Sequence, residues 1–203
     1  MIRKNLLNCN LIQLKTLTKI LFQKYMVSFH PETEVCSFCK CMGLCRIHAY
    51  YNRSVIDFFE DSTVYNSVRI PRVVCTGCGH THAILPDPII PYSTYRLLFI
   101  LRVLHLYFSH SRTIEKICER FQIVPAMLYR WKKLFQKHRS EWQGLLNCLE
   151  ESDSAFLSDL LRLSPYSSFA SSFTELTAVS FLQSHKNPSF SKRSKSPPDS
   201  VFT

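Results

Sequence analysis

The apolar and polar positions divide the chain into a central strand-forming stretch with helix-forming stretches on either side. Over residues 5–26, leucines recur at steps of three and four residues, with Asn, Gln and Lys opposite them, which predicts an amphipathic helix. Residues 46–56 and 64–74 are rich in Tyr, Val and Ile and predict two strands, joined by the polar segment 57–63. From residue 94 onward the apolar positions return to helical spacing.

Three helices are expected between residues 93 and 140. Ser93 is a candidate N-cap for an apolar, buried helix over about 94–108. A short helix is predicted from Thr113 to Phe121, and Pro125 opens the third helix at the first helical position, where proline costs no hydrogen bond. A buried helix, a short helix, a three-residue turn and a longer helix are typical of a helix-turn-helix, with an ordinary three-helix bundle as the alternative.

Two Cys-x-x-Cys pairs flank the expected strands and are candidates for one metal site. The first pair is Cys36 and Cys39, and the second is Cys75 and Cys78. The x-x spacing lets a short turn aim both sulfurs at one ion, and Gly79 suits a turn that needs a positive φ. We therefore expect four thiolates around one structural Zn²⁺, with no coordination position left for a substrate.

Other interpretations of these cysteines are weaker, and some stay open. No secretory signal is expected, which argues against disulfides, and neither pair has the strand–helix setting of a redox motif. An iron–sulfur cluster uses the same four thiolates. Cys41 and Cys45 are surplus thiols that remain alternative ligands. Three nearby histidines are expected to be surface or supporting groups rather than ligands: His48, His80 and His82.

These elements predict an α+β fold, with a small zinc-ribbon β-hairpin module followed by a helical helix-turn-helix bundle. Three prolines mark an extended linker between the two modules: Pro86, Pro88 and Pro91. The expected organisation is an N-terminal amphipathic helix (1–30), a zinc ribbon (31–88), a DNA-binding bundle (89–140), an acidic helical region (141–185) and a disordered basic tail (186–203).

The charge distribution points to an anionic partner. The 203 residues carry a net charge of +10, with ten basic and two acidic residues over 92–140 and a net charge of −5 over 141–185. The positive field therefore lies on the expected helical bundle, and nucleic acid is the commonest partner of such a field. The longest apolar run, 97–108, contains an arginine and is too short to span a bilayer, so we expect a cytoplasmic protein without a membrane partner.

The third helix of the bundle carries most of the candidate DNA contacts. Its inner face is apolar, and its solvent face is basic, with Tyr129, Arg130, Lys132, Lys133, Lys137 and Arg139. The six DNA-binding candidates are Arg112, before the second helix, and Tyr129, Arg130, Lys132, Lys133 and Lys137 of this face. The lysines are expected to bind phosphates, while Tyr129 and Arg130 lie nearest the helix start and are candidates for base contacts. A merely solvated basic face is the alternative.

The order of these motifs resembles an uncharacterised bacterial family of transposase-like proteins with an N-terminal zinc ribbon and a helix-turn-helix. It also resembles the DNA-binding part of insertion-sequence transposases. The resemblance covers about residues 36–140 and rests most on 69–92, which contains Arg-Val-Val-Cys-x-x-Cys-Gly-His-Thr-His-Ala-Ile-Leu-Pro. It implies that the four paired cysteines are zinc ligands and that 113–137 reads DNA. We expect no catalytic activity, because a strand-transfer domain needs on the order of 100–150 residues and about sixty residues of the sequence follow the bundle.

The leading hypothesis is a non-enzymatic DNA-binding protein of transposase-like or regulatory type, associated with the bacterial nucleoid when bound to DNA. One alternative is a zinc-stabilised protein-interaction adaptor whose acidic segment 141–163 folds onto its own basic face. Another is a catalytically dead transposase fragment. The amphipathic helix over 5–26 is a candidate surface for homo-oligomerisation.

Overall fold

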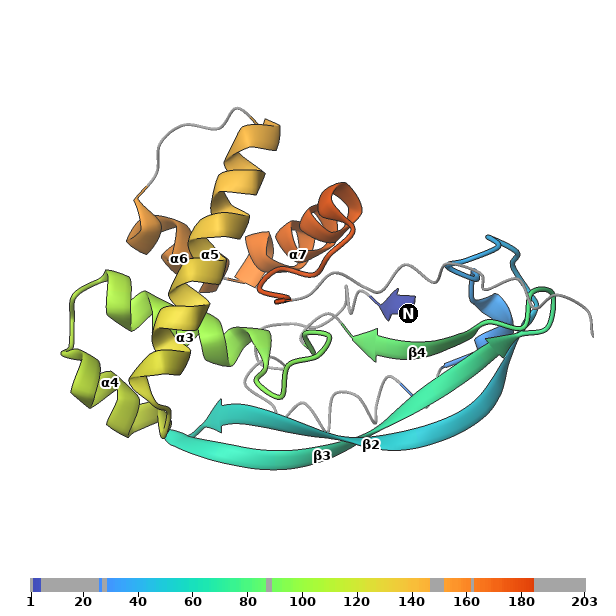
Figure 1. The fold of residues 1–203 in the computed structure, drawn as a ribbon, viewed down its shortest axis with the longest axis horizontal. Helices are drawn as coiled ribbons and strands as arrows, with labels where there is room; N and C mark the ends of the chain where they lie inside the picture. The colour runs from blue at the N-terminus through green and yellow to red at the C-terminus, as the bar shows by residue number, and fades with distance from the viewer. Residues whose placement is uncertain are drawn as a thin grey trace, which may run out of the picture.

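The computed structural model describes residues 2–4, 26, 29–86, 89–146, 152–161 and 163–184. It has the α+β class that the sequence predicts, with one sheet followed by helices (Figure 1). The elements are β1 (Ile2–Lys4), a 3-10 turn η1 (Pro31–Thr33), β2 (Cys45–Phe59), β3 (Ser62–Cys75), β4 (Thr81–Pro86), α3 (Leu97–Phe108), α4 (Ile114–Phe121), α5 (Pro125–Leu146), α6 (Asp153–Leu161) and α7 (Leu163–Thr177). The predicted helix over 5–26, apart from Met26, and the predicted tail over 186–203 lie outside the described residues.

The long antiparallel hairpin of β2 and β3 runs along one side of the molecule (Figure 1). Its strands are longer than predicted, because Asp57–Phe59 and Ser62–Thr63 continue the pairing and leave a turn of only Glu60 and Asp61. Both turn residues have positive φ, 46° and 60°, as the tightest hairpin turns require. At about 3.3 Å per residue, strands of this length reach roughly 45 Å.

The hairpin joins a sheet of order β1-β4-β3-β2, in which β4 pairs with β3 only over 72–74 and β1 pairs parallel to β4. Because strands twist, the hairpin buries different side chains along its length. In its middle, Val55, Val68 and Ile70 pack against residues that include Leu85 and Ile89. Toward the cysteines, a separate cluster is buried: Cys36, Cys45, Val73, Cys75 and Ile84.

The proline-containing segment after β4 was predicted as an extended linker. Its described part, residues 89–91, is buried. The Arg53 guanidinium in β2 donates to the carbonyl oxygens of Ile90 (2.6 Å) and Ser93 (2.9 Å). The segment is therefore packed on the hairpin, and the sheet and the helices share contacts across it.

Helix α3 begins at Leu97, three residues later than predicted, and Ser93 is not its N-cap. The reason is a tertiary contact, because the backbone N–H of Ile56 in β2 bonds to the carbonyl oxygen of Thr94 (2.8 Å). Residue Tyr95 forms a parallel bridge with the same strand, and the Ser93 hydroxyl bonds to the backbone of Tyr95 instead. This short extended stretch places α3 against the end of the hairpin.

The next two helices follow the sequence expectations closely. Thr113 caps α4, where its hydroxyl accepts a hydrogen bond from the Lys116 N–H (3.4 Å). Gln122 ends α4 in the left-handed conformation, with φ 52° and ψ 47°, and Pro125 opens α5. An aromatic cluster closes the space between α3, α4, α5 and the hairpin: Phe58, Tyr95, Phe99, Phe121 and Trp131.

Helix α6 packs against α3, and α7 packs against α6 (Figure 1). Both helices lie in the region that was predicted to be acidic and helical. Leu157 and Leu160 of α6 are buried in the main core. After α7, the Leu182 N–H donates to Nδ1 of His138 in α5 (3.0 Å), and burial lowers the pKa of this imidazole below its usual value. Among the described residues, no helix is both long and apolar enough to cross a membrane.

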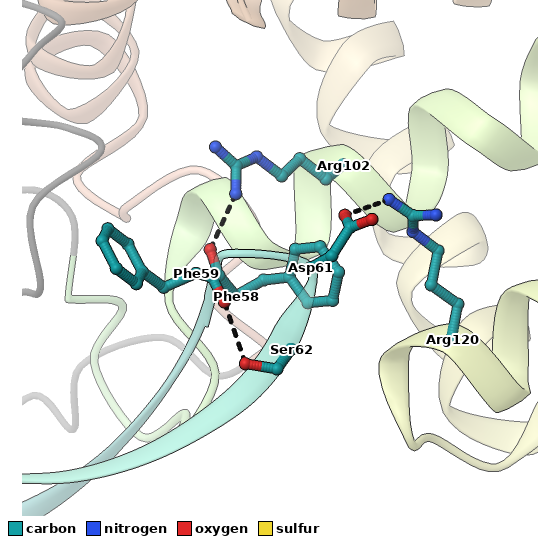
Figure 2. Close-up of polar contacts among 6 residues, drawn as sticks. All are labelled: Phe58, Phe59, Asp61, Ser62, Arg102 and Arg120. Carbon is teal, nitrogen blue, oxygen red and sulfur yellow. Dashed lines mark hydrogen bonds and ion pairs between the residues drawn. The ribbon is translucent and has the colours of Figure 1, made fainter.

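Arginines hold the tip of the hairpin against α3 and α4 (Figure 2). The Arg102 guanidinium donates to the carbonyl oxygen of Phe58 (2.8 Å), and Arg120 forms an ion pair with Asp61. Next to the tip, the hydroxyl of Thr63 donates to the carbonyl oxygen of Phe121 (3.0 Å). The hairpin end is therefore bound to both helices by polar as well as aromatic contacts.

One further ion pair in this region is buried. Arg96, just before α3, lies 3.1 Å from Asp57 in β2, and their side chains are 5% and 4% exposed. The Arg120–Asp61 pair differs, because the Asp61 side chain is 73% exposed. Each pair joins the hairpin to the helical region, one in a buried and the other in an exposed environment, so the two allow a matched comparison.

We expect Asp57→Asn to lower the free energy of unfolding by about 3–5 kcal/mol, because it leaves the buried charge of Arg96 without its counter-charge. Asp61→Asn, the exposed control, should lower it by less than about 1 kcal/mol. Urea unfolding followed by circular dichroism measures both variants. Equal losses in the two variants would show that the buried pair does not anchor the hairpin.

Candidate metal centre

Four cysteine sulfurs converge at the end of the hairpin that lies away from the helices. The sulfurs of Cys36, Cys39, Cys75 and Cys78 all lie within 4.8 Å of one another. Cys36 Sγ is 3.6 Å from Cys78 Sγ, and Cys39 Sγ is 3.6 Å from Cys75 Sγ. A tetrahedral ion with metal–sulfur bonds of about 2.3 Å places its ligands about 3.8 Å apart. The four cysteines predicted from their spacing therefore form a cluster that fits one metal ion.

Two backbone turns of the same form present these sulfurs. In the first turn, the Lys40 N–H donates to the carbonyl oxygen of Cys36 (2.9 Å), and Lys40 has a φ of 63°. In the second turn, the Gly79 N–H donates to the carbonyl oxygen of Cys75 (2.8 Å), and Gly79 has a φ of 72°. The left-handed residue after the second cysteine was predicted at Gly79, while the first turn uses a lysine in the same role.

The two turns are also fastened to each other. The Thr76 N–H of the second turn donates to the carbonyl oxygen of Leu44, just before β2 (2.8 Å). The rings of Phe38 and His80 stack across the turns, with centroids 3.7 Å apart. These contacts hold the two pairs of sulfurs at a fixed separation. The arrangement of the four sulfurs therefore depends on contacts within the protein as well as on a bound ion.

His82 in β4 adds a polar contact that sequence reasoning did not single out from its neighbours. Its Nε2 lies 3.1 Å from Cys36 Sγ, and its Nδ1 lies 3.1 Å from the Ser37 hydroxyl. The ring is 5% exposed, whereas His48 is exposed. A ring nitrogen that bonds to a thiolate withdraws some of its charge, so His82 supports the cluster in the way expected of a group outside the ligand set. Only the pairing of β4 with β3 brings it there.

The two surplus cysteines lie near the cluster but outside it. Cys41 is exposed, and its sulfur lies 3.8 Å from the carbonyl oxygen of Cys39. Cys45 is buried directly across the sheet from Cys75, and burial raises the pKa of its thiol. A buried neutral thiol at this position packs as a small apolar side chain beneath the site.

Two thiols of the cluster have pKa values that are shifted in opposite directions from the usual value. Burial raises the pKa of the Cys36 thiol, but hydrogen bonds with the backbone of Cys39 and with His82 lower it overall, to about 5. The backbone of His80 lowers the pKa of Cys78, but burial and the neighbouring thiols raise it overall, to about 12. Because thiolates repel one another, a bound cation is needed to keep all four ionised at neutral pH.

The structure places five of the six DNA-binding candidates on α5. Arg112 is exposed in the turn between α3 and α4. The remaining exposed candidates lie on α5: Tyr129, Arg130, Lys133 and Lys137. We call these four residues the basic face of α5. Lys137 lies 3.8 Å from Glu141 one turn further along the helix, and no described carboxylate lies within ion-pair distance of Arg130 or Lys133.

Two cations of α5 are less accessible than the sequence suggests. Lys132 is half-buried, and its ammonium group donates to the Tyr107 hydroxyl (2.7 Å). Arg139 was predicted on the solvent face and is instead buried, in an ion pair with Asp153 of α6. Its guanidinium also lies over the Phe156 ring, 5.3 Å from the centroid. The prediction for Arg139 was wrong because helical periodicity does not reveal that α6 covers this turn of α5.

Comparison with known proteins gives one match. Residues 36–131 match a family model described as a domain of unknown function (DUF6431), which covers a little under half of the chain. The matched segment contains both cysteine turns, the hairpin, α3, α4 and the first turns of α5. No curated protein and no solved structure matches the chain significantly. The family description names no activity, ligand or partner.

The cysteine cluster predicts about one metal ion per purified chain, measured by plasma mass spectrometry. We expect Cys75→Ser to abolish metal binding and to loosen residues 36–83, because three thiolates leave the coordination sphere open. Cys41→Ser, the matched control in the same turn region, should retain the metal. Retention of the metal in Cys75→Ser would show that other ligands hold the ion. Iron with visible absorbance would indicate an iron–sulfur cluster instead of zinc.

Proposed function

We propose that this protein is a non-enzymatic DNA-binding protein of transposase-like or regulatory type. In this proposal α4 and α5 act as a helix-turn-helix, and the four cysteines hold one structural Zn²⁺. The observation that carries the proposal is the basic face of α5, formed by Tyr129, Arg130, Lys133 and Lys137.

Charge is the first support. The first sixteen residues of α5, from Pro125 to Ser140, contain five Lys or Arg residues and no Asp or Glu. Three of the five are exposed on one side of the helix. Phosphate binding needs such a surface, because neutralised phosphates release counterions and this release drives association.

The arrangement of the helices is the second support. A short helix, a turn of Gln122, Ile123 and Val124, and a longer helix follow one another, with α3 packed against both. Leu128, Trp131 and Phe135 of α5 are buried in the core, which leaves the first turns of its basic face open to solvent. A helix supported from behind in this way can lie in a major groove.

The metal has a structural role in this proposal. Zinc suits four thiolates in a tetrahedral arrangement, and such a coordination sphere has no open position for a substrate or a reactive water. The site therefore supplies stability to the end of the hairpin rather than chemistry. The non-enzymatic part of the proposal concerns this site, where four thiolates leave the metal no position for catalysis.

A second candidate function is a protein-interaction adaptor whose acidic segment masks its own basic helix. Two contacts favour it, the ion pairs of Arg139 with Asp153 and of Lys137 with Glu141. Arg139 of the first pair is buried and lies outside the basic face. The second involves only the last residue of that face, so Arg130 and Lys133 remain available. A catalytically dead transposase fragment would bind DNA through the same face.

We expect Arg130→Ala and Lys133→Ala each to weaken binding to duplex DNA and to reduce the salt dependence of the binding constant by roughly one unit. Lys133→Ala should act equally on all sequences, whereas Arg130→Ala should also blur any preference found by selection from a random pool. Gln136→Ala, an exposed neutral position on the same helix, is the control. Fluorescence anisotropy across a salt series measures these effects. Unchanged binding in both charge variants would favour the adaptor.

A further inference from the structure

The hairpin has a second solvent-facing surface that the proposed contacts of α5 do not use. Register places Tyr50, Asn52, Ser54 and Ile56 of β2 opposite Pro71, Arg69, Ser67 and Tyr65 of β3, all on one side of the hairpin. Six of these residues are exposed: Tyr50, Asn52, Ser54, Tyr65, Ser67 and Arg69. We call them the outer face. The opposite side of the same strands is buried against β4 and the segment after it.

The outer face belongs to a stretch whose exposed charges are all positive. The exposed charged side chains of β2 and β3 are Arg46, Arg69 and Arg72. The one acidic residue within the two strands, Asp57, is buried against Arg96. Arg72, and Val74 opposite Arg46, alternate with the outer-face positions of β3, so the outer face itself carries one charge, that of Arg69. This positive charge attracts an anion to the middle of the face.

The side chains of the outer face suit a phosphate backbone in other respects. Arg69 lies over the Tyr50 ring, with its guanidinium carbon 4.3 Å from the centroid, which holds the arginine against the strand surface. Tyr65 is 67% exposed and presents a hydroxyl group. The other three members, Asn52, Ser54 and Ser67, are small polar residues whose side chains are able to donate hydrogen bonds to phosphate oxygens. No aliphatic side chain occurs among the six.

The outer face leads directly to the start of α5. Tyr65 pairs with Ile56 of β2, and Ile56 in turn forms a bridge with Tyr95 and donates its backbone N–H to the carbonyl oxygen of Thr94 (2.8 Å). The Tyr95 hydroxyl lies 3.7 Å from the Met127 sulfur in the first turn of α5, and the Tyr95 ring packs on Trp131. Figure 1 shows the hairpin ending beside α4 and the start of α5. The two surfaces are therefore neighbours on one body.

We propose that the outer face of the hairpin is a second DNA contact, which holds the phosphate backbone of the same duplex that α5 engages. This inference rests on the proposed function. From Tyr50 to Ile56 the strand advances about 20 Å, which corresponds to about six base pairs of duplex. The hairpin therefore extends the bound site at one end by about that length, without reading its sequence.

The test uses the full-length protein with its metal and two sets of duplexes. One duplex carries only the site selected for α5, and the others are longer by about six base pairs at one end or the other. We expect the parent protein to bind one of the longer duplexes more tightly and with a steeper salt dependence. Equal affinity for short and long duplexes would overturn the inference.

Variants of the outer face locate the added contact. Arg69→Ala should remove most of the gain on the long duplex and lower the salt slope there by about 0.9, with no change on the short duplex. Arg69→Lys should retain the slope, because it keeps the charge. Ser54→Ala is the neutral control on the same face. Metal content and circular dichroism verify that each variant is folded.

The outcomes separate this inference from the function on which it rests. If Lys133→Ala weakens binding while Arg69→Ala leaves it unchanged on every duplex, the hairpin surface serves another partner, such as a protein, and the inference is wrong. If neither variant weakens binding, the proposed DNA-binding function fails as well. Loss of binding in both variants, with Arg69→Ala acting only on the long duplex, supports the two contacts together.

Discussion

The pairing of β2 with β3 is the interaction on which the rest of this structure depends. The two ends of the hairpin are held by different kinds of contact. At one end, Cys75 closes β3 and supplies a sulfur to the four-cysteine cluster. At the other end, Asp57 is buried against Arg96, and Arg102 and Arg120 hold the tip. A two-stranded ribbon of this length has little core of its own, so its rigidity depends on these two attachments.

This arrangement links the cysteine cluster to the helices although they lie at opposite ends of the hairpin. The second cysteine turn fixes where β3 ends, and the β2–β3 pairing, with one register shift between Ile47 and Ala49, carries that position to the turn at Glu60 and Asp61. There the hairpin packs against Phe99 and Phe121 through Phe58. A loosened metal site therefore removes the constraint on one end of the element that supports α4. The physical link is a chain of packed and paired residues rather than a direct contact.

The helices in turn depend on the hairpin for part of their core. Ile56, Phe58 and Tyr95 pack against the buried residues of α3, α4 and α5, and Tyr95 bonds through its hydroxyl to Met127. The tip of the hairpin therefore belongs to the helical core, while the rest of the sheet buries two clusters of its own. The family match from residue 36 to residue 131 includes this tip.

The sequence by itself determined the features that depend on residues close together in the chain. The spacing of Cys36 with Cys39 and of Cys75 with Cys78 is enough to aim each pair of sulfurs, and Pro125 can only begin a helix. The tertiary structure decided the rest. Helix α3 begins later than the sequence predicts, because backbone groups just before it bond to Ile56. The β2–β3 pairing also extends further than the sequence predicts. Local periodicity records which face of an element is apolar, but not which distant element covers it. For that reason the sequence predicted neither the burial of Arg139 under α6 nor the contact of His82 with Cys36.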